Sequence, residues 1–155
     1  MLQPGQNLPY FDLPDHKGKN QTFDDLVGRR GLVVYFYPKD NTSGCTTEAM
    51  EFSADLTTFR RRGFNVLGVS KDSVRSHSNF VEKYKLRVPL LSDPDTTFIQ
   101  AVGAWGKKQS RGRTYMGILR STLVVDREGT VLLAYPSVKA RGHAKQVLAD
   151  IKDLT

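Results

Sequence analysis

The sequence of residues 31–49 is GLVVYFYPKDNTSGCTTEA, and its two halves have different patterns. The first half holds an apolar run without charge, Leu32–Tyr37, which is typical of a strand buried on both faces of a sheet. Pro38 ends this strand, because proline has no N–H to donate to a neighbouring strand. After a polar turn, apolar residues recur at helical spacing at positions 49, 52, 56 and 59. The only cysteine of the chain, Cys45, therefore lies at the turn from strand to helix.

The position of Cys45 at the start of a helix favours a chemically reactive thiol. In or just before a first helical turn, N–H groups without intrahelical partners and the helix dipole stabilise an anion, so the thiol is expected to exist partly as thiolate. Thr42 places a hydroxyl three residues before the sulfur, able to bond the sulfur or a bound oxygen. Gly44 lets the backbone approach closely, so its N–H groups could hold a small polar substrate. The alternative is a buried structural cysteine, the commoner role of a lone cysteine, but the polar, glycine-containing turn weighs against it.

Length and composition indicate one globular domain over residues 1–155. The hydrophobic content of 39% and charged content of 25% are ordinary for a soluble protein of this length, which can bury a full core. One cysteine excludes an intramolecular disulfide, a Cys-x-x-Cys pair and a thiolate-rich metal site. The first residues show no signal-peptide pattern, and no apolar run reaches the length of a membrane span. We therefore expect a cytoplasmic protein without membrane contact.

The net charge of +7 raises the possibility of nucleic-acid binding. The basic residues cluster at 60–62, at 107–113, and at Lys139 with Arg141. No nucleic-acid motif accompanies them, so surface charge that keeps the protein in solution is the favoured interpretation, and no specific nucleic-acid partner is expected. The three histidines lie in separate segments without ligand-like spacing, and no metal is expected.

Four further segments have the composition of strands: 64–69, 89–91, 121–126 and 130–135. The last two are separated by the turn 127–129, which predicts an antiparallel hairpin. At the N-terminus, residues 10–13 and 21–23 indicate a second, small hairpin. Residues 113–120 indicate an extended arm.

Helical patterns alternate with these strands. A short helical turn is expected with Asp24 as its cap and Gly28 after its end, and Gly63 ends the long helix that contains Cys45. Asp72 or Ser73 can cap the next helix, and Thr97–Val102 indicates a short one. The last helix has one apolar face, formed by Ala144, Val147, Leu148, Ile151 and Leu154. This order predicts an α/β fold, a thioredoxin-like sandwich with a mixed β-sheet flanked by helices and a small N-terminal β-hairpin extension.

The segment around Cys45 closely resembles the peroxiredoxins, in particular the bacterioferritin comigratory protein (Q-type) group. The matching residues are Tyr35–Asp40, Thr42, Gly44–Thr46 and Glu48–Ala49. A second match lies far along the chain, at Tyr115–Ile118 followed by Arg120–Thr122 and the strand that ends at Asp126. Smaller agreements occur at 89–93 and 102–106, so the resemblance covers nearly the whole chain.

The resemblance implies a role for each matching residue. Cys45 is the peroxidatic nucleophile, Thr42 and Arg120 complete the peroxide pocket, and Pro38 shields the thiolate from water. A fixed guanidinium beside the sulfur favours the thiolate and can bond a peroxide oxygen, whereas the alternative is a surface arginine that ends an extended arm. For Glu48, two interpretations stay open: it orients this network, or it is a solvated acid in the first turn of a helix.

The implied activity is that of a thiol peroxidase. The thiolate attacks hydrogen peroxide or a small organic hydroperoxide and is left as a sulfenic acid, without a metal or other cofactor. Two competing functions are a disulfide oxidoreductase and a redox sensor or chaperone-like protein. The first needs Cys-x-x-Cys, and Thr42 stands where its first cysteine would be.

Two positions depart from the group's pattern. Many relatives carry a resolving cysteine five residues after the first, where this chain has Met50, or on the next helix near Phe80 and Val81. The resemblance then implies a one-cysteine mechanism in a monomer, with an external thiol as reductant: thioredoxin, a glutaredoxin-like protein or a low-molecular-weight thiol. A disulfide between two copies of Cys45 is a poorer option, because two pocket thiols would have to meet. Ser43 replaces the group's usual proline, and its hydroxyl could cap the helix.

Overall fold

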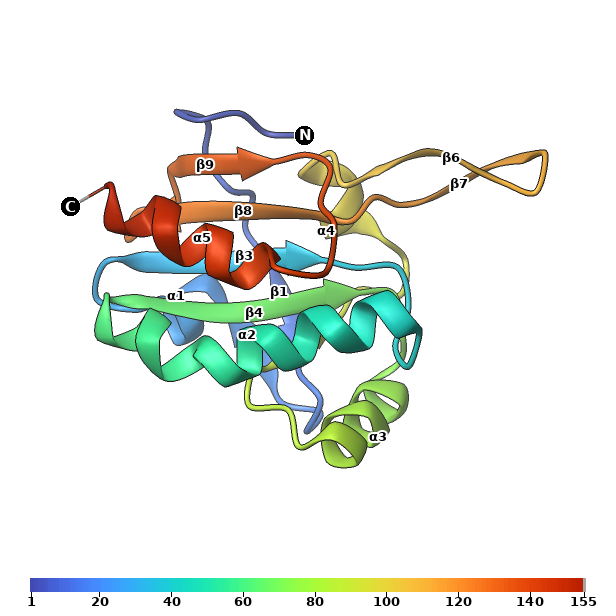
Figure 1. Cartoon of the computed structure of the whole chain (residues 1–155), viewed down its shortest axis with the longest axis horizontal. Helices are drawn as coiled ribbons and strands as arrows, with labels where there is room; N and C mark the ends of the chain where they lie inside the picture. The colour runs from blue at the N-terminus through green and yellow to red at the C-terminus, as the bar shows by residue number, and fades with distance from the viewer. Residues whose placement is uncertain (155) are drawn as a thin grey trace.

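A mixed five-stranded sheet forms the centre of the protein in a computed structural model, which describes residues 1–154 (Figure 1). The strands lie in the order β5-β4-β3-β8-β9. They are β3 (Gly31–Phe36), β4 (Phe64–Ser70), β5 (Leu90–Ser92), β8 (Ser121–Asp126) and β9 (Val131–Tyr135). β3, β4 and β5 are parallel, whereas β8 is antiparallel to β3 and β9 to β8. This sheet confirms the predicted α/β class.

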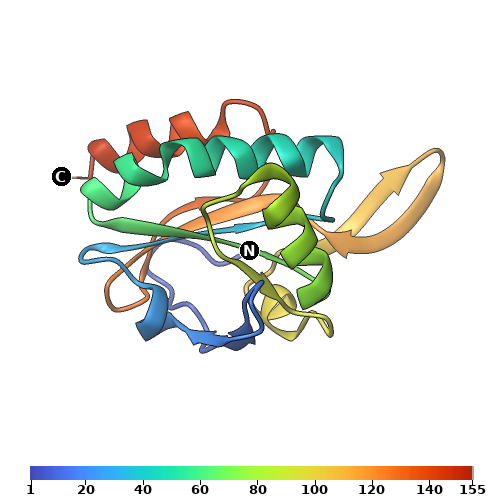
Figure 2. The ribbon, with the colours of Figure 1, turned by 90° about the horizontal axis from the view of Figure 1, so that it is seen from below.

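Helices cover both faces of the sheet (Figure 2). On one face, α2 (Ser43–Arg61) and α5 (His143–Lys152) lie side by side. The other face carries α1 (Phe23–Leu26), α4 (Thr97–Ala101) and the hairpin of β1 (Asp12–Pro14) and β2 (Asn20–Thr22). α3 (Val74–Tyr84) follows β4 and adds Phe80 to the core beneath α2. Within residues 1–154, no helix is long and apolar enough to cross a membrane.

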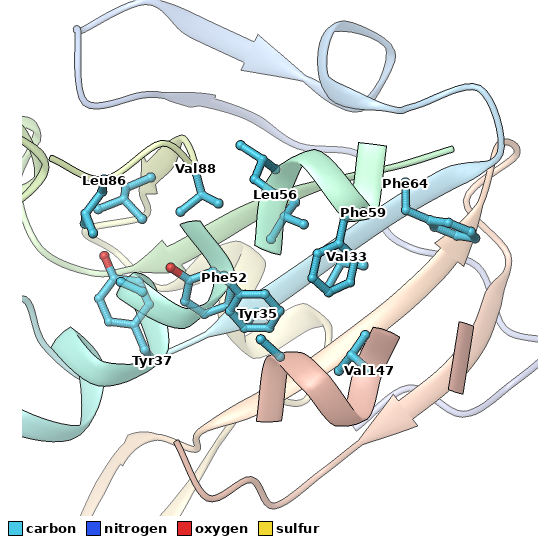
Figure 3. Packing of buried hydrophobic residues seen from close by; sticks show 14 of the residues in the cluster. Val33, Tyr35, Tyr37, Phe52, Leu56, Phe59, Phe64, Leu86, Val88 and Val147 are labelled. Atoms are coloured by element: carbon cyan, nitrogen blue, oxygen red, sulfur yellow. The ribbon is translucent and has the colours of Figure 1, made fainter. Parts of the chain in front are cut away.

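The central strand β3 explains why the core has two halves. Every residue of β3 is buried, and successive side chains point to opposite faces. Val33 and Tyr35 pack beneath α2 and α5, where Tyr35 stacks on Phe52 with ring centroids 4.6 Å apart (Figure 3). Val34 and Phe36 join the core on the opposite face. Each such side chain contributes roughly 1.5–3 kcal/mol by leaving water, which fixes β3 at the centre.

A second hairpin, β6 (Trp105–Ser110) with β7 (Arg113–Ile118), stands apart from the main sheet. The sequence predicts an extended arm only over the second half of this region. The strand β6 was not expected, because its polar residues lack an apolar alternation. Its turn is built from Arg111 and Gly112, both with positive φ (50° and 77°), the backbone that two-residue hairpin turns require.

Three helix ends differ from the prediction. α1 begins at Phe23 with Thr22 as its N-cap, and Asp25 accepts hydrogen bonds from both the N–H and the hydroxyl of Thr22 (2.8 and 2.9 Å), so Asp24 is not the cap. The N-cap of α2 is Thr42, and Ser43 is its first helical residue, so the predicted cap is wrong. α5 ends at Lys152, and Leu154, which is 39% exposed, follows in a tighter turn. Ser73 caps α3 as predicted, accepting from the Ser76 N–H.

Candidate active site

Cys45 is the third residue of α2 and is almost completely buried, with 1% of its surface exposed. The helix starts here because Thr42 is extended (φ −79°, ψ 155°) and its carbonyl accepts the first helical hydrogen bond, from Thr46 N at 2.9 Å. The N–H groups of the first helical turn have no acceptor within the helix, and the helix dipole adds a partial positive charge. The backbone around the sulfur therefore favours a negative charge.

A second positive charge reaches the sulfur from a distant part of the chain. The Nη2 atom of Arg120 donates to Cys45 Sγ at 3.2 Å, although the two residues are 75 positions apart. The register of the sheet causes this approach, because Phe36, the last residue of β3, pairs with Ser121 at the start of β8. Arg120 therefore lies beside the end of β3, where the turn into α2 begins. A β-carbon at Gly44 would lie 3.1 Å from the same Nη2, so glycine leaves room for the guanidinium.

Glu48 holds the other side of this guanidinium. Arg120 Nη1 donates to Glu48 Oε1 at 2.7 Å, and the Glu48 carboxyl is 1% exposed. Burial raises the pKa of Glu48 from 4.5 to about 7, against the effect of Arg120. Burial also opposes the charge of Arg120, but Glu48 and Cys45 together raise its pKa. Glu48 is thus not a solvated acid, and Arg120 is not a free surface residue.

Unpaired polar atoms mark the same part of the structure. Among the described residues, the buried side-chain atoms without a hydrogen-bond partner are Tyr35 Oη, Thr46 Oγ1 and Glu48 Oε2. Two of them, Thr46 and Glu48, follow Cys45 within the first two turns of α2. Buried polar groups in folded proteins are nearly all paired, so these atoms can take a further hydrogen-bond partner.

The two remaining predicted residues lie in the turn before the helix. Thr42 donates its hydroxyl hydrogen to the Lys39 carbonyl at 2.8 Å, and no hydrogen bond joins it to Cys45 among the described residues. Its oxygen keeps lone pairs that can accept a hydrogen bond. Pro38 is half-buried immediately after β3. The structure therefore brings Cys45, Arg120 and Glu48 into direct contact and places Thr42 and Pro38 at the turn beside them.

A buried pair between Asp40 and His77 also holds this turn, and the sequence analysis missed it. His77 Nδ1 lies 2.7 Å from Asp40 Oδ2, and Nε2 lies 3.0 Å from the Leu91 carbonyl. Because a carbonyl oxygen only accepts, Nε2 is the donor in the contact with Leu91. Tyr37 and Ser76 donate to the same carboxylate at 2.7 and 2.8 Å. The pair thus ties the turn to α3.

Asp72 extends this network at the end of β4. Its Oδ2 accepts from Asp40 N at 2.9 Å and from Ser70 Oγ at 2.6 Å. Ligand atoms of Asp40, Asp72 and His77 lie within 4.8 Å of one another, close enough in principle for a metal ion. Each of these residues already has protein partners, so the geometry is that of a hydrogen-bond network.

Comparisons with known proteins agree with this site. The sequence model of the AhpC/TSA family matches residues 4–134, so the chain belongs to that family. A peroxiredoxin, Bcp from Xanthomonas campestris, is 45% identical and aligns over 92% of this chain and 89% of its own. Family and relatives together confirm the predicted enzyme class, a thiol peroxidase of the Bcp and Q type.

Solved structures support the fold over the same length. A Cys-to-Ser mutant of Xylella fastidiosa PrxQ superposes with a TM-score of 0.92, at 35% identity over 99% of this chain and 98% of its own. A structure of the Xanthomonas campestris bacterioferritin comigratory protein, determined to explain that protein's alkyl peroxide reduction activity, has a TM-score of 0.86. It is 42% identical over 93% of this chain and 91% of its own.

Proposed function

We propose that Cys45 is the peroxidatic nucleophile of a one-cysteine cycle that reduces hydrogen peroxide and small organic hydroperoxides. The observation that carries the proposal is the 3.2 Å contact between the Arg120 guanidinium and Cys45 Sγ, at the start of a helix. The thiolate attacks one peroxide oxygen, a sulfur–oxygen bond forms and the oxygen–oxygen bond breaks. The leaving oxygen takes up a proton and departs as water or an alcohol, and Cys45 becomes a sulfenic acid.

The neighbouring residues have separate parts in this step. Arg120 stabilises the thiolate and the negative charge that develops on the peroxide, since a fixed donor in a buried site needs no reorganisation. Glu48 positions Arg120, because it contacts the guanidinium and not the sulfur. Thr42 offers its hydroxyl oxygen to the peroxide hydrogen, Gly44 leaves space beside the guanidinium, and Pro38 limits access of water to the thiolate. The activity of the Xanthomonas relative on alkyl peroxides supports organic hydroperoxides as substrates.

An external thiol completes the cycle. Met50 is 48% exposed on α2, and Phe80 and Val81 occupy α3, so no second cysteine is available within the chain. A first thiol condenses with the sulfenic acid and releases water, leaving a mixed disulfide on Cys45. A second thiolate then attacks the donor's sulfur and frees Cys45. The reductant class is thioredoxin, a glutaredoxin-like protein or a low-molecular-weight thiol, and the enzyme works as a cytoplasmic monomer of one domain, residues 1–155.

Peroxide consumption tests this proposal. Wild type and Cys45→Ser are given hydrogen peroxide or cumene hydroperoxide with dithiothreitol as reductant, and Met50→Ala serves as a control on the same helix. Wild type and the control should turn over many equivalents of both peroxides, and Cys45→Ser none. Stoichiometric oxidation of Cys45 without turnover would favour a redox sensor, and turnover by Cys45→Ser would contradict the proposal.

A further inference from the structure

The β6–β7 hairpin is a positively charged structure next to the active site, whose base packs against the core through Trp105 and Ile118 and whose residues 109–116 are exposed. It extends away from the main sheet, and its two strands pair only with each other (Figures 1 and 2). Residues 105–118 contain four cations, Lys107, Lys108, Arg111 and Arg113, and no aspartate or glutamate.

Lys108 places one face of the hairpin near the active site. Lys108 pairs with Tyr115 and Ser110 with Arg113, so by strand alternation Lys108, Arg113 and Tyr115 share a face. Burial and the nearby Arg120 lower the pKa of Lys108, while Cys45 acts in the opposite direction, which places Lys108 within electrostatic reach of the site. Tyr115 on this face is 47% exposed, an unusual exposure for a large aromatic side chain.

A second basic cluster lies in a loop that packs beside the active site. Lys139 and Arg141 belong to the loop between β9 and α5, and Val138 N of this loop donates to the Arg120 carbonyl at 3.1 Å. The side chain of Ala140 lies 3.9 Å from the position of a β-carbon on Gly44. The remaining cluster, 60–62, lies at the far end of α2, about 25 Å from Cys45 at 1.5 Å per residue. The loop cluster and the base of the hairpin therefore lie near Cys45, whereas the cluster at 60–62 does not.

We propose that the β6–β7 hairpin docks a protein thiol with an acidic surface, the reductant of Cys45. This inference rests on the one-cysteine cycle proposed above. Six residues per strand extend about 20 Å, so Arg111 and Arg113 near the turn lie beyond the reach of a small thiol bound at Cys45. A partner that touches both the sulfur and the turn has the size of a protein, and four cations without an acid select a negative one.

The hairpin raises the rate at which the protein thiol associates with the enzyme, and the residues around Cys45 carry out the thiol chemistry. Complementary charge raises the association rate of protein pairs by roughly 10–10³-fold at low salt. The exposed Tyr115, on the same face as Lys108 and Arg113, supplies apolar contact area of the kind found in the middle of protein interfaces. The docked thiolate attacks the sulfenic sulfur, a sulfur–sulfur bond forms and the sulfur–oxygen bond breaks, and the leaving hydroxide takes up a proton from the solvent and departs as water. A second thiol of the same partner then displaces Cys45 as thiolate.

The test compares two charge reversals of equal size in two hairpins of the same chain. Arg111→Glu with Arg113→Glu changes the β6–β7 turn, and Lys17→Glu with Lys19→Glu changes the β1–β2 turn on the opposite face of the sheet (Figure 2). Each protein is oxidised with one equivalent of hydrogen peroxide and mixed with a reduced thioredoxin of net negative charge. The second-order rate constant of Cys45 reduction is measured at low and high salt, and again with dithiothreitol, which is uncharged.

The β6–β7 variant should react with the thioredoxin about tenfold more slowly at low salt, and its rate should depend less on salt. The β1–β2 variant should stay within about twofold of wild type, and dithiothreitol should reduce all three proteins equally. Equal losses in both variants, or no loss in either, would overturn the inference, as would a thioredoxin that fails to reduce wild type. Binding of a DNA duplex that only the β6–β7 variant loses, with unchanged reduction, would assign the hairpin to nucleic acid instead. If peroxide does not oxidise Cys45 in the first step, the proposed function fails and not the docking.

Discussion

Two buried polar pairs hold the turn that carries Cys45, and they differ in what they touch. Arg120 and Glu48 contact the sulfur directly and leave Glu48 Oε2 without a partner. Asp40 and His77 are as deeply buried, do not contact the sulfur, and are surrounded by hydrogen-bond partners. The first pair is arranged for chemistry at the sulfur. The second is arranged for stability, so variants of the two pairs should fail in different ways.

The largest effect is expected at Arg120. Arg120→Ala removes the donor beside Cys45 Sγ, and loss of one such donor from a preorganised site slows a reaction by roughly 10²–10³-fold. The rate constant of Cys45 oxidation by hydrogen peroxide measures this loss. Arg120→Lys keeps the charge without the planar fork and should recover only part of the rate. Recovery of the full rate in Arg120→Lys would show that charge alone is sufficient.

The next effect concerns folding. His77→Ala leaves the Asp40 carboxylate buried without its imidazole, and breaking a buried pair costs about 3–5 kcal/mol. The free energy of unfolding in urea should fall by about that amount, whereas Ser76→Ala, which removes one hydrogen bond to the same carboxylate, should cost about 1 kcal/mol. Oxidation of the remaining folded protein should slow less than in Arg120→Ala. The reverse order of rates would contradict the separation between the two pairs.

A third prediction uses the pH dependence of Glu48. Burial raises the pKa of its carboxyl from 4.5 to about 7, so the folded state favours the protonated form. Its contribution to stability is complete below about pH 4.5 and is lost as the pH rises through about 7. Glu48→Gln has no such titration, and a shift of this size corresponds to about 3 kcal/mol. Urea unfolding should show the stability of wild type relative to Glu48→Gln falling across this range. A stability difference between wild type and Glu48→Gln that is constant, or that rises with pH, would contradict the raised pKa of Glu48.

The smallest effect is expected at Ser43. As the first helical residue of α2 it occupies the position where proline is preferred, and Thr42 before it is already extended, as a residue before proline must be. Ser43→Pro should therefore raise the free energy of unfolding by about 0.4–1 kcal/mol, by restricting the unfolded chain. Ser43→Ala is the control and should not stabilise. A lower free energy of unfolding for Ser43→Pro would contradict the assignment of Ser43 as the first helical residue of α2.

Local sequence patterns predicted the frame of the molecule but only part of the site. The apolar run of β3 and the spacing of the apolar residues in α2 locate Cys45 at a helix start, because both signals lie within twenty residues of it. The contact of Arg120 with Cys45 depends on the pairing of β3 with β8, which no local pattern specifies, and only the family resemblance predicted it. The pairing of Asp40 with His77 was missed for the same reason, since 37 residues separate them.

Polar strands and helix caps were predicted less well. β6 has no apolar alternation, so its pairing with β7 follows from the turn at Arg111 and Gly112 and not from its composition. The cap of α1 could be assigned to either of two neighbouring polar residues, and the side chain of Asp25 decides for Thr22.

The claim that Cys45 is a peroxidatic thiol activated by Arg120 is tested most directly by a single turnover. Reduced wild type and Arg120→Ala are mixed with one equivalent of hydrogen peroxide, quenched over time with a sulfenic-acid trap, and analysed by mass spectrometry at Cys45. The account predicts rapid formation of trapped sulfenic acid on wild-type Cys45, reversed by dithiothreitol when the trap is omitted, and formation slower by roughly 10²–10³-fold in Arg120→Ala. Oxidation of both proteins at the rate of an ordinary exposed thiol would contradict it.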